Sequence, residues 1–194
     1  MSSLKKNRHL PVLVVASIVS VLLLLLAGCG GSSEAQQHVK KGEDRLLAKS
    51  ASMTEQEAQA NSQKVFTAIS EAAQTGQPIS QETVSLAKQL SAELDKAKAG
   101  FVGAKAEFEK ALQSSDVGKY KNYAELQLQG ADLTLKYMLL MQSVLDDAAS
   151  QLPSSGFDQQ AWQARLQEFL STLQASSQQT TDIENKIQDA KKKL

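Results

Sequence analysis

The sequence predicts an all-α protein, an up-down antiparallel bundle of three to four long helices with coiled-coil-like packing. Only 5% of the 194 residues are aromatic and only three are proline. All-β folds usually contain more aromatic and turn residues. Ala, Gln, Lys, Glu, Ser and Leu dominate the composition, which favours helices. In addition, apolar residues recur at alternating spacings of three and four, which places a stripe along one side of a helix.

Turn signals divide the chain after residue 33 into four stretches. Glycine, proline and serine clusters mark the breaks, and the second cluster also offers an N-cap: Thr75-Gly76-Gln77-Pro78, Ser114-Ser115-Asp116 and Pro153-Ser154-Ser155-Gly156. We therefore expect helices over residues 34–74, 81–113, 117–152 and 158–193. The short connections predict antiparallel neighbours, with helices roughly 50 Å long at about 1.5 Å per residue.

The stripes predict which side of each helix is buried. In the second stretch the stripe comprises Ala87, Leu90, Leu94, Ala97, Phe101, Ala104, Phe108 and Ala111. In the fourth stretch it includes Trp162, Leu166, Phe169, Leu173, Ser176, Thr180, Ile183, Ile187, Ala190 and Leu194. The third stretch has additional apolar residues beside its stripe, so we expect it to be the most buried helix, with two neighbours.

The first stretch has the weakest apolar pattern. Thr54 and Glu57 have the spacing of a capping box, so this stretch is either one helix or two. We expect its beginning, near Gly42, to extend away from the bundle as a stalk.

Three glycines interrupt the predicted helices. Gly100 and Gly103 each cost about 1 kcal/mol relative to alanine, so we expect a bend or a closely approaching neighbour there. Gly130 lies in the stripe of the third stretch, where we expect it to accommodate a bulky side chain such as Phe101 or Trp162.

The N-terminal segment has the layout of an export signal. Lys5, Lys6 and Arg8 precede residues 10–26, an apolar run that only two serines interrupt. A positive segment followed by an apolar one is typical of secretory signals. An uncleaved membrane anchor is the alternative, because about 17 apolar residues are near the minimum for spanning a bilayer.

The next residues, Leu26-Ala27-Gly28-Cys29, resemble the lipobox of bacterial lipoproteins. This resemblance implies that the sulfur of Cys29 carries a diacylglyceryl group and that cleavage occurs between Gly28 and Cys29. Residues 1–28 would then be the signal peptide, 29–33 a flexible tether and 34–194 the helical domain. In a cell with two membranes, Gly30 after the cysteine resembles outer-membrane-destined lipoproteins. In a cell with one membrane, the protein would face outward.

Charge and cysteine content exclude several classes of function. Without Lys5, Lys6 and Arg8, 18 of the 21 basic residues remain against 21 acidic residues. This acidic balance argues against nucleic-acid binding. A lone cysteine excludes an internal disulfide and any multi-cysteine metal site.

No catalytic or phosphate-binding motif stands out, so we expect no enzyme activity, no cofactor and no metal. His38 is expected to be a solvated residue near the tether. Glu107 and Glu109, between Lys105 and Lys110, are expected to form a solvated charged face. Adjacent Asp146 and Asp147 point in different directions on a helix.

The aromatic residues allow two interpretations. Phe157, Trp162 and Phe169 begin the fourth stretch, and they either pack in the core or line a ligand pocket with Tyr120, Tyr123 and Tyr137. We name Trp162, Phe157 and Tyr137 as candidate ligand or partner contacts. Lys191, Lys192 and Lys193 complement a helix dipole, and they could also contact anionic headgroups or wall polymers.

These observations predict a non-catalytic helical module in the cell envelope, anchored to a membrane by lipid on Cys29. It would bind other envelope proteins or act as a scaffold or spacer. An apolar or aromatic small ligand held between helices is the alternative. The oligomeric state stays open, because the stripes could also pair helices of different chains.

Overall fold

The protein is an all-α bundle in which long antiparallel helices pack together, as the sequence predicts. The computed structural model describes residues 33–47 and 53–194. Its elements are α2 (Glu34–Leu47), α3 (Glu55–Thr75), α4 (Gln81–Gln113), the 3₁₀ turn η3 (Gly118–Tyr120), α5 (Lys121–Gln151) and α6 (Gln159–Lys191). The predicted signal peptide, Cys29 and the tether up to residue 32 lie outside the described residues.

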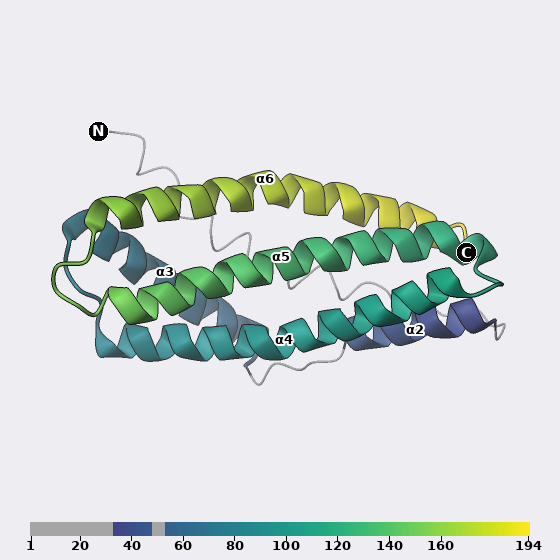
Figure 1. The fold of residues 1–194 in the computed structure, drawn as a ribbon, viewed down its shortest axis with the longest axis horizontal. Helices are drawn as coiled ribbons and strands as arrows, with labels where there is room; N and C mark the ends of the chain where they lie inside the picture. Colours follow the sequence, from purple (N-terminus) through teal and green to yellow (C-terminus); the bar gives the residue numbers. More distant parts are fainter. Residues whose placement is uncertain (1–32, 48–52) are drawn as a thin grey trace.

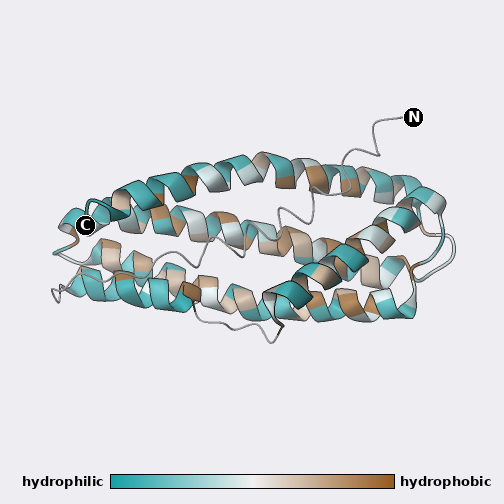
Figure 2. Ribbon diagram, turned by 180° about the vertical axis from the view of Figure 1, so that it is seen from behind, coloured by the Kyte–Doolittle hydropathy of each residue, from teal (hydrophilic) through white to brown (hydrophobic). Residues whose placement is uncertain are grey.

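Helices α4, α5 and α6 lie side by side, with α5 in the middle, and successive helices run in opposite directions (Figure 1). α5 therefore has two long neighbours, as predicted. Helices α2 and α3 both lie on one face of this layer, behind it in Figure 1. α2 packs on α4, whereas α3 contacts both α4 and α6 and crosses the layer obliquely (Figure 2). Among the helices of the described residues, none has an apolar run long enough to cross a membrane.

The first predicted stretch is two helices, and local capping explains where α3 begins and ends. The capping box is present: Thr54 Oγ1 accepts a hydrogen bond from the Glu57 amide at 3.2 Å, and Glu57 Oε2 accepts one from the Thr54 amide at 2.9 Å. α3 ends at Gly76, whose φ of 72° lies in the left-handed region that favours glycine. The predicted break at Thr75–Pro78 is confirmed.

Asp116 caps a different helix from the one expected. The sequence suggested that the Ser114–Asp116 turn caps the third stretch. Instead, Asp116 Oδ2 and Oδ1 accept hydrogen bonds from the amides of Glu34 and Ala35 at 2.9 and 3.1 Å. The chain enters α5 through η3, whose N-cap Val117 provides no side-chain bond. The acceptor serves α2 because the fold brings the start of α2 to the α4–α5 turn.

This cap allows a direct test of how α2 is fixed. We expect Asp116→Ala to lower the free energy of unfolding by about 1 kcal/mol, because two amides at a helix N-terminus lose their acceptor. Ser115→Ala changes an exposed residue in the same turn, and it should alter the free energy of unfolding by less than about 0.5 kcal/mol. Urea unfolding of both variants measures the difference. Equal values would show that the cap does not stabilise the fold.

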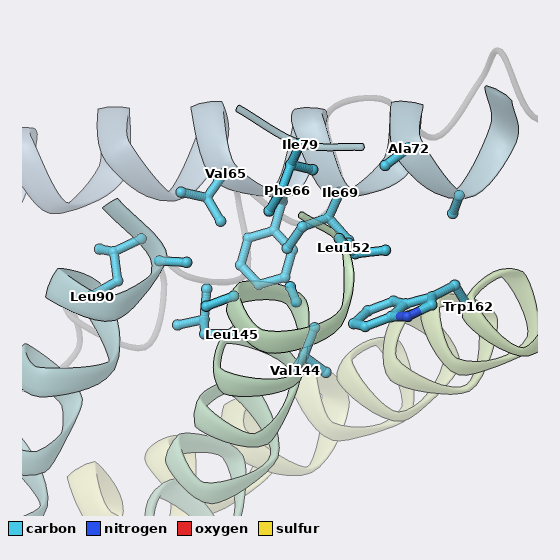
Figure 3. Close-up of a cluster of buried hydrophobic side chains, with 14 of the residues drawn as sticks. Val65, Phe66, Ile69, Ala72, Ile79, Leu90, Val144, Leu145, Leu152 and Trp162 are labelled. Atoms are coloured by element: carbon cyan, nitrogen blue, oxygen red, sulfur yellow. The ribbon is translucent and has the colours of Figure 1, made fainter. Parts of the chain in front are cut away.

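Most of the apolar core lies in two clusters, one near each end of the bundle. The larger cluster lies at the end formed by the α3–α4 and α5–α6 connections, where side chains from α3, α5 and α6 converge (Figure 3). There the rings of Phe66 and Phe169 stack with their centroids 5.3 Å apart. A second cluster at the α2 end joins residues of α2, α4, η3, α5 and α6. It contains Ala35, Val39, Ala111, Tyr120, Tyr123, Ala124, Leu126, Ile187 and Ala190.

The beginning of the first stretch is not a stalk, because α2 packs closely on α4. A Cβ atom added at Gly42 would lie 2.6 Å from Cε1 of Phe108, so the ring occupies the space that a side chain would need. At Gly103, an added Cβ would lie 2.7 Å from an Arg45 guanidinium nitrogen. The close approach expected at Gly100 and Gly103 is therefore present, and the approaching residue is Arg45.

Gly130 has different neighbours from those expected. A Cβ added there would lie 3.5 Å from side-chain carbons of Ile183 and Ile187 on α6, which is an ordinary contact. Phe101 instead clusters with Ala131 and Met138, and Trp162 belongs to the core at the other end. The antiparallel register of α5 and α6 places the C-terminal half of α6 beside Gly130.

Candidate functional site

The most distinctive polar contacts among the described residues are those that attach α2 to the other helices. Its N-terminus is bonded to Asp116, and the side chains of His38 and Glu43 contact the three long helices. In contrast, α3 contributes mainly apolar side chains to the core. Polar contacts therefore hold α2 in one position and register.

His38 and Glu107 form a shielded pair between α2 and α4. His38 Nδ1 and Glu107 Oε2 are 2.7 Å apart, and the side chains are only 18% and 7% exposed. Lys110 Nζ donates to Glu107 Oε1 at 3.0 Å. The predictions of a solvated His38 and a solvated Glu107 are therefore wrong. They fail because α2, distant in sequence, covers this part of α4.

These hydrogen bonds keep Glu107 ionised. The bond with His38, followed by the bond with Lys110, lowers the pKa of Glu107 from 4.5 to about 2. An unfolded chain loses these partners and binds a proton near the ordinary pKa. This carboxylate therefore stabilises the fold above about pH 4.5 and loses that contribution as the pH falls towards 2.

The pH dependence of unfolding tests this contribution. We expect the free energy of unfolding to fall less steeply between pH 4.5 and 2 in Glu107→Gln than in the unchanged protein. Glu109→Gln, at an exposed position on the same helix, is the control and should follow the unchanged protein. Parallel curves for Glu107→Gln and Glu109→Gln would show that Glu107 is not specially paired.

A second polar cluster joins α2 to α5 and α6. Tyr123 Oη donates to Glu43 Oε1 at 2.5 Å, and Gln127 Nε2 donates to Tyr123 Oη at 2.7 Å. Lys191 Nζ lies 3.3 Å from the same Glu43 oxygen. Burial and the neighbouring Glu43 carboxylate raise the pKa of Tyr123, so the phenol remains a hydrogen-bond donor.

The aromatic residues singled out from the sequence do not meet at one end of the bundle. Trp162 is buried in the large cluster (Figure 3), and Phe157 packs against that cluster. Tyr120 and Tyr123 belong to the cluster at the α2 end. Tyr137 is buried on α5, and its hydroxyl has no hydrogen-bond partner among the described residues. Ligand or partner binding by Trp162, Phe157 and Tyr137 remains a prediction.

Both clusters connect α2 to the long helices through polar side chains. Within residues 33–47 and 53–194, no group of three or more His, Cys, Asp or Glu residues is placed to hold a metal ion. His38 is hydrogen-bonded to the Glu107 carboxylate, and Tyr123 donates to Glu43. Both clusters can therefore fix α2 in place.

Sequence reasoning missed Asp116, Glu43 and Gly42 as determinants of this site. Their partners are 82, 80 and 66 residues away in the chain. No local motif reports contacts over such separations. Comparisons with protein-family models, curated proteins and solved structures find no match to this chain.

Proposed function

We propose that the protein is a lipid-anchored module of the bacterial cell envelope, without catalytic activity, that acts as a scaffold or spacer and binds other envelope proteins. The sequence support is the lipobox-like Leu26-Ala27-Gly28-Cys29 after an export-signal pattern. The structural observation that carries the proposal is the fixed start of α2. This helix begins five residues after Cys29, and Asp116 holds its first amides at the α4–α5 turn.

These positions define which end of the bundle would face the lipid. Five residues of extended chain span at most about 18 Å. A lipid on Cys29 would therefore keep the α4–α5 turn close to the membrane surface. α4 has 33 residues, which corresponds to roughly 50 Å of helix. The α3–α4 and α5–α6 connections would then be free to project outward.

A spacer needs α2 to be held rigidly against the rest of the bundle. A stalk would let the bundle take any orientation, whereas α2 contacts α4, α5 and α6 through specific polar pairs. The anchor would thereby be coupled to the bundle through only a short tether. We expect the exposed far end, at residues 153–156, to be the part that meets other envelope proteins.

Photo-cross-linking in intact cells tests this proposal. A photoreactive amino acid replaces the exposed Ser155 at the far end or the exposed Ser115 at the near end. We expect position 155 to capture a reproducible set of envelope proteins and position 115 to capture mainly lipid. Capture of lipid with equal yield at both positions would contradict the orientation. Recovery of only the protein itself and lipid at position 155 would contradict partner binding.

A further inference from the structure

The two ends of the bundle carry opposite charge. The end that holds the start of α2, the α4–α5 turn and the last residues of α6 comprises residues 33–35, 113–121 and 189–194 (Figure 1). We call it the lysine end. It contains five lysines, Lys119, Lys121, Lys191, Lys192 and Lys193, and three acidic residues, Glu34, Asp116 and Asp189. The far end, residues 74–82 and 150–160, contains Glu82 and Asp158 but no lysine or arginine.

The fold creates this concentration of lysines from two distant segments. Lys119 Nζ donates to the main-chain oxygen of Leu194 at 2.7 Å, which joins the α4–α5 turn to the residues after α6. Lys119, Lys121, Lys192 and Lys193 are all exposed. The sequence alone shows only the run at 191–193, and the structure adds Lys119 and Lys121 to it.

Two acidic side chains at this end, Asp116 and Asp189, have partners within the fold. The Asp116 carboxylate accepts from the two α2 amides. Asp189 pairs with Lys192 at 3.0 Å, but the two side chains are 69% and 74% exposed. Such exposed pairs are weak and leave Lys192 able to exchange partners. The lysine end therefore presents exposed positive charge beside the start of α2.

We propose that the lysine end contacts the anionic headgroups of the membrane that holds the lipid on Cys29. This inference rests on the proposed function, because the tether length brings these lysines to that surface. Each lysine near an anionic surface contributes about 1 kcal/mol of attraction, or about fivefold in the equilibrium. The negative far end would be repelled. The charge asymmetry would thus hold the bundle upright on its lysine end.

Depth-dependent fluorescence quenching tests this contact on the full lipidated protein. Ser115→Cys and Ser155→Cys each carry a dye, one at each end. The protein is placed in vesicles of phosphatidylcholine or of an equal mixture of phosphatidylcholine and phosphatidylglycerol, with a headgroup-attached quencher. We expect the dye at 115 to be quenched several-fold more in the mixed vesicles, and high salt should reverse the increase.

Charge variants decide whether the lysines are responsible. Lys121→Gln, Lys192→Gln and Lys193→Gln together should abolish the increase caused by phosphatidylglycerol. The matched control removes the same number of charges from exposed positions elsewhere, with Lys64→Gln, Lys88→Gln and Lys136→Gln. This control should retain the increase in quenching. Circular dichroism confirms that both variants are folded. An increase that survives in the first triple variant would overturn the proposal.

The same quenching measurements distinguish an incorrect lysine contact from an incorrect orientation of the anchored bundle. If the dye at 115 is quenched more than the dye at 155, but equally in both vesicle types, the anchored orientation holds and the lysine contact is wrong. If the dyes at 115 and 155 are quenched alike in both vesicle types, the orientation itself is wrong. In that case Lys191, Lys192 and Lys193 serve only the negative end of the α6 dipole.

Discussion

Leu145→Ala should lower the free energy of unfolding by about 2 to 5 kcal/mol, because it leaves a cavity in the main core. Leu145 on α5 is 1% exposed and belongs to the large cluster. It lies on the side of α5 that faces α3, near Phe66 (Figure 3). Helices from three parts of the chain meet at this point, so the cavity cannot close by movement of a single loop. Chemical unfolding with two spectroscopic probes gives the measurement.

The same helix offers a matched control. Leu139 lies six residues earlier on α5, and it is 56% exposed. We expect Leu139→Ala to change the free energy of unfolding by less than about 0.5 kcal/mol. The substitution is identical in both variants, so their difference isolates burial. A loss of several kcal/mol in Leu139→Ala would mean that another surface covers this position in the folded protein.

Gly42→Ala should lower the free energy of unfolding by about 1 to 2 kcal/mol, although alanine is the better helix former. The added methyl group would lie 2.6 Å from Phe108, whose ring is completely buried. The ring or the whole of α2 must therefore shift. We expect the amides of α2 to lose protection from hydrogen exchange in this variant, while those of α3 keep theirs.

Gly130→Ala provides the comparison at another interior helix position. The added methyl group would lie 3.5 Å from Ile183 and Ile187, an ordinary contact distance. The gain in helix propensity should then dominate and raise the free energy of unfolding by about 0.5 to 1 kcal/mol. The two substitutions should thus have opposite signs. Stabilisation by Gly42→Ala would contradict the close packing of α2 against Phe108.

The sequence was sufficient to predict the bundle because its determinants are local. Apolar periodicity marks the long helices, and Thr54 with Glu57 marks the start of α3 within four residues. The seat of α2 could not be predicted, because its polar side chains make their contacts only after the bundle has formed. The sequence of α2 has few apolar residues, which by itself favours a stalk. Its contacts with Glu107, Phe108 and Tyr123 become visible only in the folded structure.

The same distinction applies to the candidate sites. Asp116 has the residue type and position of a local N-cap, and only the fold shows that it serves Glu34 and Ala35. The lysine run at 191–193 is visible in the sequence, but its proximity to the α4–α5 turn depends on the lengths of α5 and α6. In contrast, the lipobox prediction rests on four consecutive residues and does not depend on the fold.

Lipid attachment at Cys29 is the central claim, and labelling with a radioactive fatty acid tests it most directly. Cells producing the unchanged protein or Cys29→Ser are grown with the label, and the immunoprecipitated proteins are compared by gel electrophoresis and mass spectrometry. We predict that the unchanged protein carries the label and lacks residues 1–28. Cys29→Ser should carry no label and remain as the longer precursor. Equal labelling of the two proteins, or an unlabelled mature protein, would contradict the account.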